Sequence, residues 1–150
     1  GDKTAGIDRF VRRYDLLDPS IRSRLVIEND ERLYTISDCL AIHERTGVPV
    51  IMDSFHHSLL NNGEMFADLL GPVRQTWKMA DGIPMVDYSS QEPEKRAGAH
   101  AEHIVADNFR QFLATTWPAN FDIMLEIKDK ETSALEALGI AKGDPRLVSG

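Results

Sequence analysis

The stretch Val50-Ile51-Met52-Asp53 decides the fold, because three consecutive apolar residues end there in a carboxylate. Three further stretches repeat this pattern, namely Leu25-Val26-Ile27-Glu28, Pro84-Met85-Val86-Asp87 and Ile123-Met124-Leu125-Glu126. Near-continuous apolar runs of this length are typical of parallel strands that are covered on both faces. We therefore predict four parallel strands, each of which ends in an acidic residue.

The segments between these strands have helical periodicity. Thr35-Ile36-Ser37-Asp38 resembles a capping box, and it predicts a helix through Arg45 that Gly47 ends. Pro72 is expected to kink the next helix. Further helices are predicted over residues 8–17, 64–80 and 99–116, and Thr132 to Leu138 begins the last one.

Strands that alternate with helices imply right-handed crossovers and a parallel sheet. Four βα units are half of an eight-unit TIM-type barrel, which needs about 250 residues. The sequence thus predicts an α/β fold, a TIM-type half-barrel that forms a single domain over residues 1–150, with residues 143–150 as a tail.

The amino-acid composition excludes fewer classes of protein than the pattern of strands does. The 150 residues include a single cysteine, Cys39, which favours a reducing, cytoplasmic compartment, and no apolar run is long enough to span a membrane. The net charge of −7 and the lack of a Lys/Arg block argue against a nucleic-acid partner. Bound divalent cations would reverse the field locally, so charge alone does not decide the question.

The four strand-end carboxylates are the strongest chemical signal. Active sites of parallel α/β folds lie at the carboxyl ends of the strands, so these acids should meet at one rim. A single acid there is most simply an exposed loop residue or a helix cap. Four acids in the same register repel one another unless cations compensate, so we predict several divalent metal ions.

The histidines lie where they could add ligands. His56 and His57 follow Asp53 in a predicted loop, and His56 could bind a neighbouring ion. His100 is expected near the start of the helix predicted over residues 99–116, where it points back toward the rim. His103 is expected one turn further along that helix. His43, in the middle of the helix that begins at the Thr35 capping box, is expected to be structural or exposed.

Mixed carboxylate and imidazole ligands suit zinc or manganese better than calcium. A cluster of two or three such ions could activate water for an in-line displacement at phosphate. It could equally support isomerisation of a sugar, and the spacing does not choose between these chemistries.

Several strings resemble the UV damage endonuclease family over about residues 24–138. The resemblance rests on Leu25-Val26-Ile27-Glu28-Asn29-Asp30-Glu31, Ile42-His43-Glu44-Arg45-Thr46-Gly47-Val48-Pro49-Val50, Asp53-Ser54-Phe55-His56-His57, Tyr88-Ser89-Ser90-Gln91, Gly98-Ala99-His100-Ala101 and Phe121-Asp122-Ile123-Met124-Leu125-Glu126-Ile127-Lys128-Asp129-Lys130-Glu131. It implies a DNA repair enzyme on a TIM-type barrel that uses manganese or similar ions. Such an enzyme incises damaged duplex DNA 5′ to UV photoproducts and some other lesions.

The resemblance also implies roles for individual residues. Glu28 would bridge two ions and, with Glu126, be catalytic. Asp53, His100 and Glu126 would complete the second metal site, and His56 and Asp87 would belong to a third. The loop residues Ser89, Ser90, Gln91, Lys95 and Arg96 could contact DNA phosphate, although a solvated loop is an equally simple interpretation.

Two departures from the family pattern bear on activity. The resemblance covers only the C-terminal half of the family barrel, and Met85 stands where many members have a lysine. We therefore expect the chain to pair with an N-terminal half-barrel or with a second copy. The alternatives are a metal-dependent sugar isomerase or epimerase, and a metal-binding half-barrel without catalytic activity.

Overall fold

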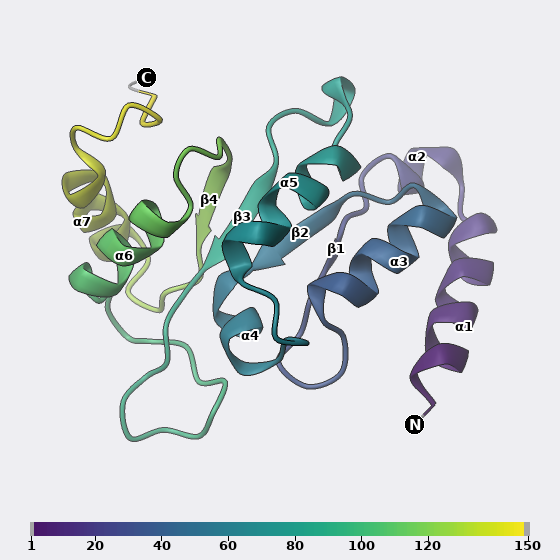
Figure 1. The fold of residues 1–150 in the computed structure, drawn as a ribbon, viewed down its shortest axis with the longest axis horizontal. Helices are drawn as coiled ribbons and strands as arrows, with labels where there is room; N and C mark the ends of the chain where they lie inside the picture. The colour runs from purple at the N-terminus through teal and green to yellow at the C-terminus, as the bar shows by residue number, and fades with distance from the viewer. Residues whose placement is uncertain (1, 149–150) are drawn as a thin grey trace.

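The computed structural model describes residues 2–148, which form one four-stranded parallel sheet in the order β1-β2-β3-β4 (Figure 1). The strands are β1 (Ile27–Glu28), β2 (Val50–Asp53), β3 (Met85–Tyr88) and β4 (Asp122–Leu125). Each lies within one residue of the predicted strand end, and all three pairings are parallel. The prediction of an α/β fold with four parallel strands is confirmed.

Seven α-helices and one 3-10 turn connect or flank the strands within the described residues. They are α1 (Lys3–Asp15), α2 (Pro19–Arg22), α3 (Ile36–Thr46), α4 (Ser54–Leu59), α5 (Phe66–Thr76), η1 (Met79–Asp81), α6 (Ala106–Thr115) and α7 (Glu131–Ala141). None of them has both the length and the apolar character that crossing a membrane requires.

The main core forms between the helices and one face of the sheet. Val50, Met52, Val86 and Tyr88 alternate along β2 and β3, and all four are buried in it. The helices contribute Ile36, Cys39, Leu69, Val73, Phe109, Phe112 and Ala137 to the same cluster. Because successive strand residues point to opposite faces, the residues between them project from the other face.

The first crossover helix confirms the predicted capping box. The Thr35 hydroxyl accepts from the amide of Asp38, and the Asp38 carboxylate accepts from the amide of Thr35. Gly47 ends α3 in the left-handed conformation at φ 72°, where a side chain would be strained. His43 donates from Nδ1 to the carbonyl of Val48 at 2.8 Å, which is a structural contact.

The predicted helix over residues 99–116 is wrong in its first half. The structure has an extended loop up to Val105, and α6 begins only at Ala106. The backbone of this loop pairs with distant segments, since Ala101 donates to the carbonyl of Ser90 and Lys128 donates to that of Ala101. These long-range hydrogen bonds replace the local ones that a helix would need.

Other boundaries also differ from the prediction. The predicted loop after Asp53 is the short helix α4, and α5 spans fewer residues than the predicted 64–80. Helix α1 begins earlier than residue 8, and α7 begins at Glu131, one residue before the predicted start. These corrections leave the order of strands and crossovers unchanged.

The predicted tail is docked against α6 as far as the structure describes it, and residues 149–150 lie outside the described part. The guanidinium of Arg146 donates to the Leu113 carbonyl at 2.8 Å and to the Ala119 carbonyl at 3.2 Å, and it pairs with Asp144 at 2.6 Å. It also lies 5.4 Å from the centre of the Trp117 ring. Arg146 thereby closes the C-terminal end of α6.

Candidate metal centre

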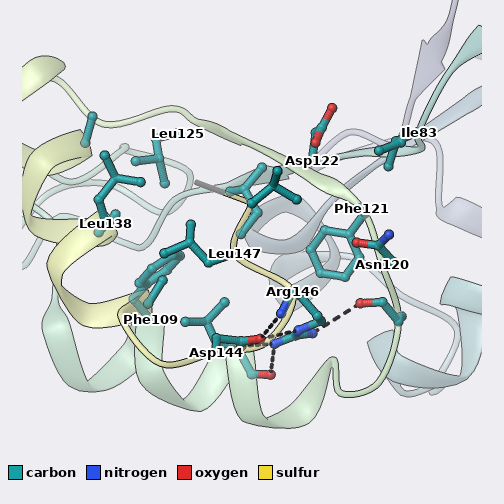
Figure 2. A pocket seen from close by; sticks show the side chains of 17 residues that line it. Ile83, Phe109, Asn120, Phe121, Asp122, Leu125, Leu138, Asp144, Arg146 and Leu147 are labelled. Carbon is teal, nitrogen blue, oxygen red and sulfur yellow. Dashed lines mark hydrogen bonds and ion pairs between the residues drawn. The ribbon is translucent and has the colours of Figure 1, made fainter. Parts of the chain in front are cut away.

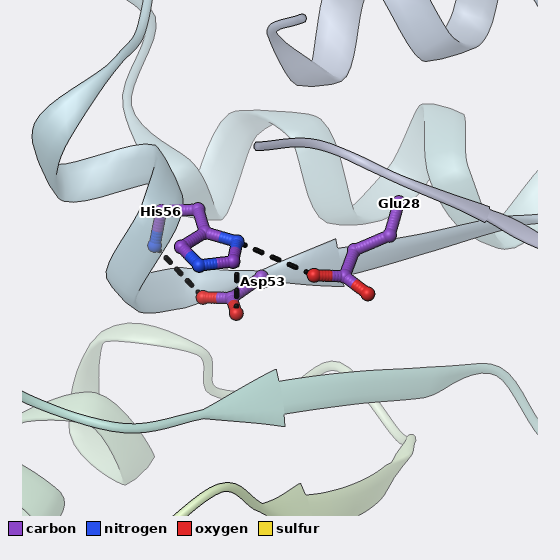
Figure 3. A group of neighbouring side chains, drawn as sticks. All are labelled: Glu28, Asp53 and His56. Carbon is purple, nitrogen blue, oxygen red and sulfur yellow. Dashed lines mark hydrogen bonds and ion pairs between the residues drawn. The ribbon is translucent and has the colours of Figure 1, made fainter. Parts of the chain in front are cut away.

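Glu28, Asp53 and His56 come together at the carboxyl ends of β1 and β2 (Figure 3). Nδ1 of His56 lies 3.3 Å from Oε1 of Glu28 and 3.2 Å from Oδ2 of Asp53. One ligand atom from each residue lies within 4.8 Å of the others. This spacing is close enough for the three side chains to share cations.

Asp53 has two roles in this arrangement. Its Oδ1 accepts from the amide of His56 at 2.8 Å and so caps the N-terminus of α4. Its Oδ2 is buried and has no hydrogen-bond partner among residues 2–148. The cap fixes the carboxylate on one side and leaves the other oxygen available for a ligand.

His56 and His100 show the same hydrogen-bond pattern. Nδ1 of His56 lies 3.1 Å from the carbonyl of Asn29, and Nδ1 of His100 lies 3.0 Å from that of Glu126. A carbonyl can only accept, so in each ring Nδ1 carries the hydrogen and Nε2 has the free electron pair. Metal-binding histidines commonly donate their second ring nitrogen to a carbonyl or carboxylate in this way.

The remaining predicted ligands lie near these three residues. Asp87 is the direct partner of Asp53 in the pairing of β3 with β2. Oε2 of Glu126 lies 3.6 Å from Nδ1 of His100, and the His100 and His56 rings are 5.8 Å apart at their centres. The six residues predicted as ligands therefore lie at one rim of the sheet.

The electrostatics show how strongly these acids act on one another. Burial raises the pKa of Asp87 to about 7, with further contributions from Glu28, Glu126 and Asp53. Burial and then Asp53 and Glu126 raise the pKa of Glu28. The cluster of carboxylates is therefore costly to keep charged without a cation.

Two further groups titrate in the same field. Burial raises the pKa of Asp53, although the contacts with His56 offset part of this effect. Burial alone would lower the pKa of His56, but Asp53 and the Asn29 carbonyl outweigh it and raise the pKa above its ordinary value. The negative charge around His56 thus favours the protonated ring more than it would for an exposed histidine.

The donor set fits divalent metal ions. Oδ1 of Asp87 is buried without a hydrogen-bond partner among the described residues, as is Oδ2 of Asp53. Buried polar atoms in proteins nearly always have hydrogen-bond partners. Apart from the ion pair between Asp53 and His56, these two oxygens have none among the described residues, which points to a cation as the missing partner. Carboxylate oxygens with imidazole nitrogens suit zinc or manganese.

The long loop between β3 and α6 lies at the same end of the sheet as α4 (Figure 1). Ser89 and Ser90 are buried in it. The side chain of Gln91 bonds to the carbonyls of Glu92 and Arg96 and to the amide of Gly98, so it holds the loop together. A role in DNA binding for these residues stays a prediction.

The two basic residues of this loop are exposed. Lys95 pairs with Oε1 of Glu102 at 3.1 Å, and the same oxygen accepts from Lys128 at 2.7 Å. Arg96 is exposed. The side chains of Lys95 and Arg96 can therefore reach a ligand in solvent more readily than those of Ser89 and Gln91.

Two neighbours of Glu28 belong to this region but were not predicted. Oε2 of Glu31 lies 3.9 Å from Nε2 of His56, on the side of the ring away from the Asn29 carbonyl. Asn29 is 1% exposed and bonds to Asp53. The position of Glu31 three residues after Glu28 was a usable signal for the first, but nothing in the sequence distinguishes Asn29 from an ordinary loop residue.

A separate apolar pocket of about 380 Å³ lies beside the edge strand β4 (Figure 2). Phe121, Leu125, Leu138 and Leu147 line it, together with Arg146 at one side. None of the six predicted metal ligands is among its lining residues. The pocket therefore belongs to the open edge of the sheet and not to the metal centre.

Several known proteins are similar to this chain over most of its length. A family model described as UV-endonuclease UvdE matches residues 1–142. The UV DNA damage endonuclease of Clostridium perfringens (strain 13 / Type A) is 35% identical over 144 residues, which are 95% of this chain and 35% of that protein. The enzyme of the same name from Bacillus mycoides (strain KBAB4) is 34% identical over 140 residues, 92% of this chain and 44% of that protein.

A solved structure extends the comparison to the fold. The crystal structure of SacUVDE superposes with a TM-score of 0.90 at 48% sequence identity, over 97% of this chain and 48% of that one. The chain thus spans less than half the length of each of these three relatives.

Proposed function

The chain belongs to the UV-endonuclease UvdE family, and we propose that it forms the C-terminal, metal-binding half of a UV damage repair endonuclease on a TIM-type barrel. The complete enzyme would hydrolyse the phosphodiester 5′ to UV photoproducts and related lesions in duplex DNA, in the cytoplasm. The observation that carries this proposal is the convergence of Glu28, Asp53, Asp87 and Glu126 at one rim, where two buried carboxylate oxygens have no hydrogen bond among the described residues.

The proposed ligands fall into groups that share ions. Glu28 would bridge two ions, and Asp53, His100 and Glu126 would complete one of these sites. His56 and Asp87 would hold a further ion, so that a complete enzyme contains two or three. Manganese or zinc in this position would lower the pKa of a bound water and neutralise charge on the phosphate.

The residues of this chain contribute orientation as well as charge. The carbonyls of Asn29 and Glu126 hold the rings of His56 and His100 with Nε2 free. Glu28 and Glu126 are exposed, whereas Asp53 and Asp87 are buried. The two exposed glutamates would therefore face the reacting phosphate. Lys95 and Arg96, with Ser89 and Gln91 of the same loop, would contact the DNA backbone.

The open edges of the sheet favour an N-terminal half-barrel as the partner. A parallel barrel has no free edge, whereas here β1 and β4 each pair on one side only among the described residues. An apolar hollow lies beside each, one lined by Ile7, Phe10 and Ile27, the other the pocket shown in Figure 2. We propose that strands of the N-terminal half lie against these edges, and a second copy of the chain is the alternative occupant.

A nicking assay on end-labelled duplex DNA tests the proposed function. The chain is incubated with manganese and UV-irradiated or unirradiated duplex, alone and with the N-terminal half of a family member. We expect nicks 5′ to photoproducts only when both halves are present, and loss of nicking in Glu126→Gln. Absence of nicking by a complex that holds its metal would overturn the catalytic role, and efficient nicking by the chain alone would overturn the need for a partner.

A further inference from the structure

Asn29 lies directly after Glu28, and its side chain is enclosed between β1 and β2. Its Nδ2 donates to the carbonyl of Asp53 at 3.1 Å, and its Oδ1 accepts from the amide of Asp53 at 2.9 Å. Only 1% of the residue is exposed. One side-chain amide thus pairs with both main-chain groups of a proposed metal ligand.

These two bonds continue the pairing of β1 with β2 beyond the point where the backbone ladder stops. The ladder covers Ile27 opposite Val50 and Glu28 opposite Ile51. Past that register the chain after Glu28 turns into a loop, and the Asn29 amide takes the place that a peptide group of a longer strand would occupy. Glu28 and Asp53 are therefore fixed relative to each other by a side chain.

The main chain of Asn29 contacts the third member of the cluster. Its carbonyl lies 3.1 Å from Nδ1 of His56, in the orientation that leaves Nε2 free. The amide that holds residue 29 against Asp53 also holds this carbonyl in place. Asn29 thus connects three proposed ligands from different elements. It follows Glu28 in the chain, bonds to Asp53 and contacts the ring of His56.

We propose that Asn29 is a positioning residue of the metal centre, which holds Asp53 beside Glu28 and fixes the ring of His56 without contacting a metal ion itself. This inference rests on the proposed metal-binding function. A partner of this kind acts through the ligands, and its loss typically lowers metal affinity about 10- to 100-fold.

The chemistry of the site makes asparagine hard to replace. Alanine leaves the amide and the carbonyl of Asp53 buried without partners. Leucine fills a similar volume but cannot bond to either group. Serine keeps a polar atom at the site, but its shorter side chain cannot pair with both groups at once.

A matched control separates positioning from stability. Thr76 is 2% exposed, and its hydroxyl accepts from the amide of Val50 at 3.0 Å, at the opposite end of β2. Thr76→Val removes a buried side-chain bond to the same strand, far from the carboxylates. Asn29→Ala and Thr76→Val should both lower the free energy of unfolding, and only Asn29→Ala should alter metal binding.

The test titrates the full chain with manganese by calorimetry and records the ¹⁵N chemical shifts of the His56 ring without metal. We expect Asn29→Ala to weaken manganese binding about 10- to 100-fold and to mix the two ring tautomers, whereas Thr76→Val matches the wild type in both. Asn29→Ser should give a smaller loss and serves if the alanine variant does not fold.

The outcomes are distinct. Wild-type affinity and a single tautomer in both Asn29 variants would overturn the proposal. Equal losses of affinity in the Asn29 and Thr76 variants would overturn it as well, because the effect would then be one of stability. If the wild-type chain binds no manganese or zinc, the proposed metal-binding function fails first, and the inference fails with it.

Discussion

Asp53 and Asp87 are direct partners in the parallel pairing of β2 with β3, and each has one buried oxygen without a hydrogen bond among residues 2–148. Two carboxylates at adjacent, matched positions of a sheet repel each other. In this fold they lie on the face opposite the main core, where Glu28 and Glu126 add further charge. The most direct tests concern what balances this charge.

Replacing Glu28 by glutamine should remove much of the metal binding. In the wild type, manganese at a hundredfold excess over its dissociation constant should raise the free energy of unfolding by about 2.7 kcal/mol. In Glu28→Gln the increase should be small, because one shared ligand is lost. Elemental analysis and denaturant unfolding with and without manganese measure both effects.

The control for this variant is Glu44→Gln, which makes the same change of charge at an exposed position of α3. It should keep the wild-type response to manganese. Unchanged metal content in Glu28→Gln would exclude Glu28 as a ligand.

The raised pKa of Asp87 predicts the pH dependence of the metal-free protein. The folded state keeps a proton on Asp87 up to a pKa of about 7, whereas the unfolded chain loses it near the ordinary value of 3.8. The folded state binds more protons between these values, so the free energy of unfolding should fall as pH rises from about 4 to 7. Urea unfolding in a chelator at several pH values measures this slope.

Asp87→Asn should flatten that slope, whereas Asp15→Asn on the exposed end of α1 should leave it unchanged. Metal binding to the wild type should also strengthen over the same pH range, because the ion displaces the proton. A slope that is the same in Asp87→Asn as in the wild type would show that another group holds the proton.

Removal of the capping box should destabilise α3. Thr35→Ala deletes the hydroxyl that caps the Asp38 amide, and it should lower the free energy of unfolding by about 1 kcal/mol. Thr132→Ala, at an exposed position in α7, is the comparison. Denaturant unfolding measures the loss of free energy of unfolding in the two variants. Equal losses would contradict a capping effect, because they would reflect only the removal of a threonine.

The open edges of the sheet should make the isolated chain associate. Met124 in β4 is 48% exposed, and its side chain projects from the face opposite the core. Met124→Lys should reduce association measured by sedimentation velocity, because charged side chains on an edge strand oppose pairing. Met79→Lys, at a fully exposed position in η1, is the control.

A wild-type chain that stays monomeric and folded at high concentration would contradict this expectation. Addition of the N-terminal half should suppress self-association, because the two partners compete for the same edges.

The strand ends and the acids on them were predictable from the sequence because the signal is local. An apolar run that ends in Asp53 or Glu28 predicts a strand from its own residues. Because the strands are parallel, the same run also places its final acid at the rim of the sheet. The capping box at Thr35 is local in the same sense. All of these predictions about the fold are confirmed.

The loop before α6 was mispredicted because its hydrogen bonds are not local. Ala99 to Ile104 has helix-compatible residues, yet its backbone pairs with the segments after β3 and β4. The hydrogen bonds of Arg146 to α6 and of Asn29 to Asp53 were missed for the same reason, because they also join distant parts of the chain. Such contacts depend on where distant parts of the chain meet, which periodicity and spacing do not encode.

The strict alternation along β2 and β3 has a consequence for how genes of this kind can change. Val50, Met52, Val86 and Tyr88 fill the core, and Asp53 and Asp87 occupy the opposite face. A single-codon insertion inside either strand would exchange the two faces beyond it and place a carboxylate in the apolar core. Insertions and deletions should therefore be purged from the four strands, while the exposed stretch from Pro93 to Ala97 can vary in length.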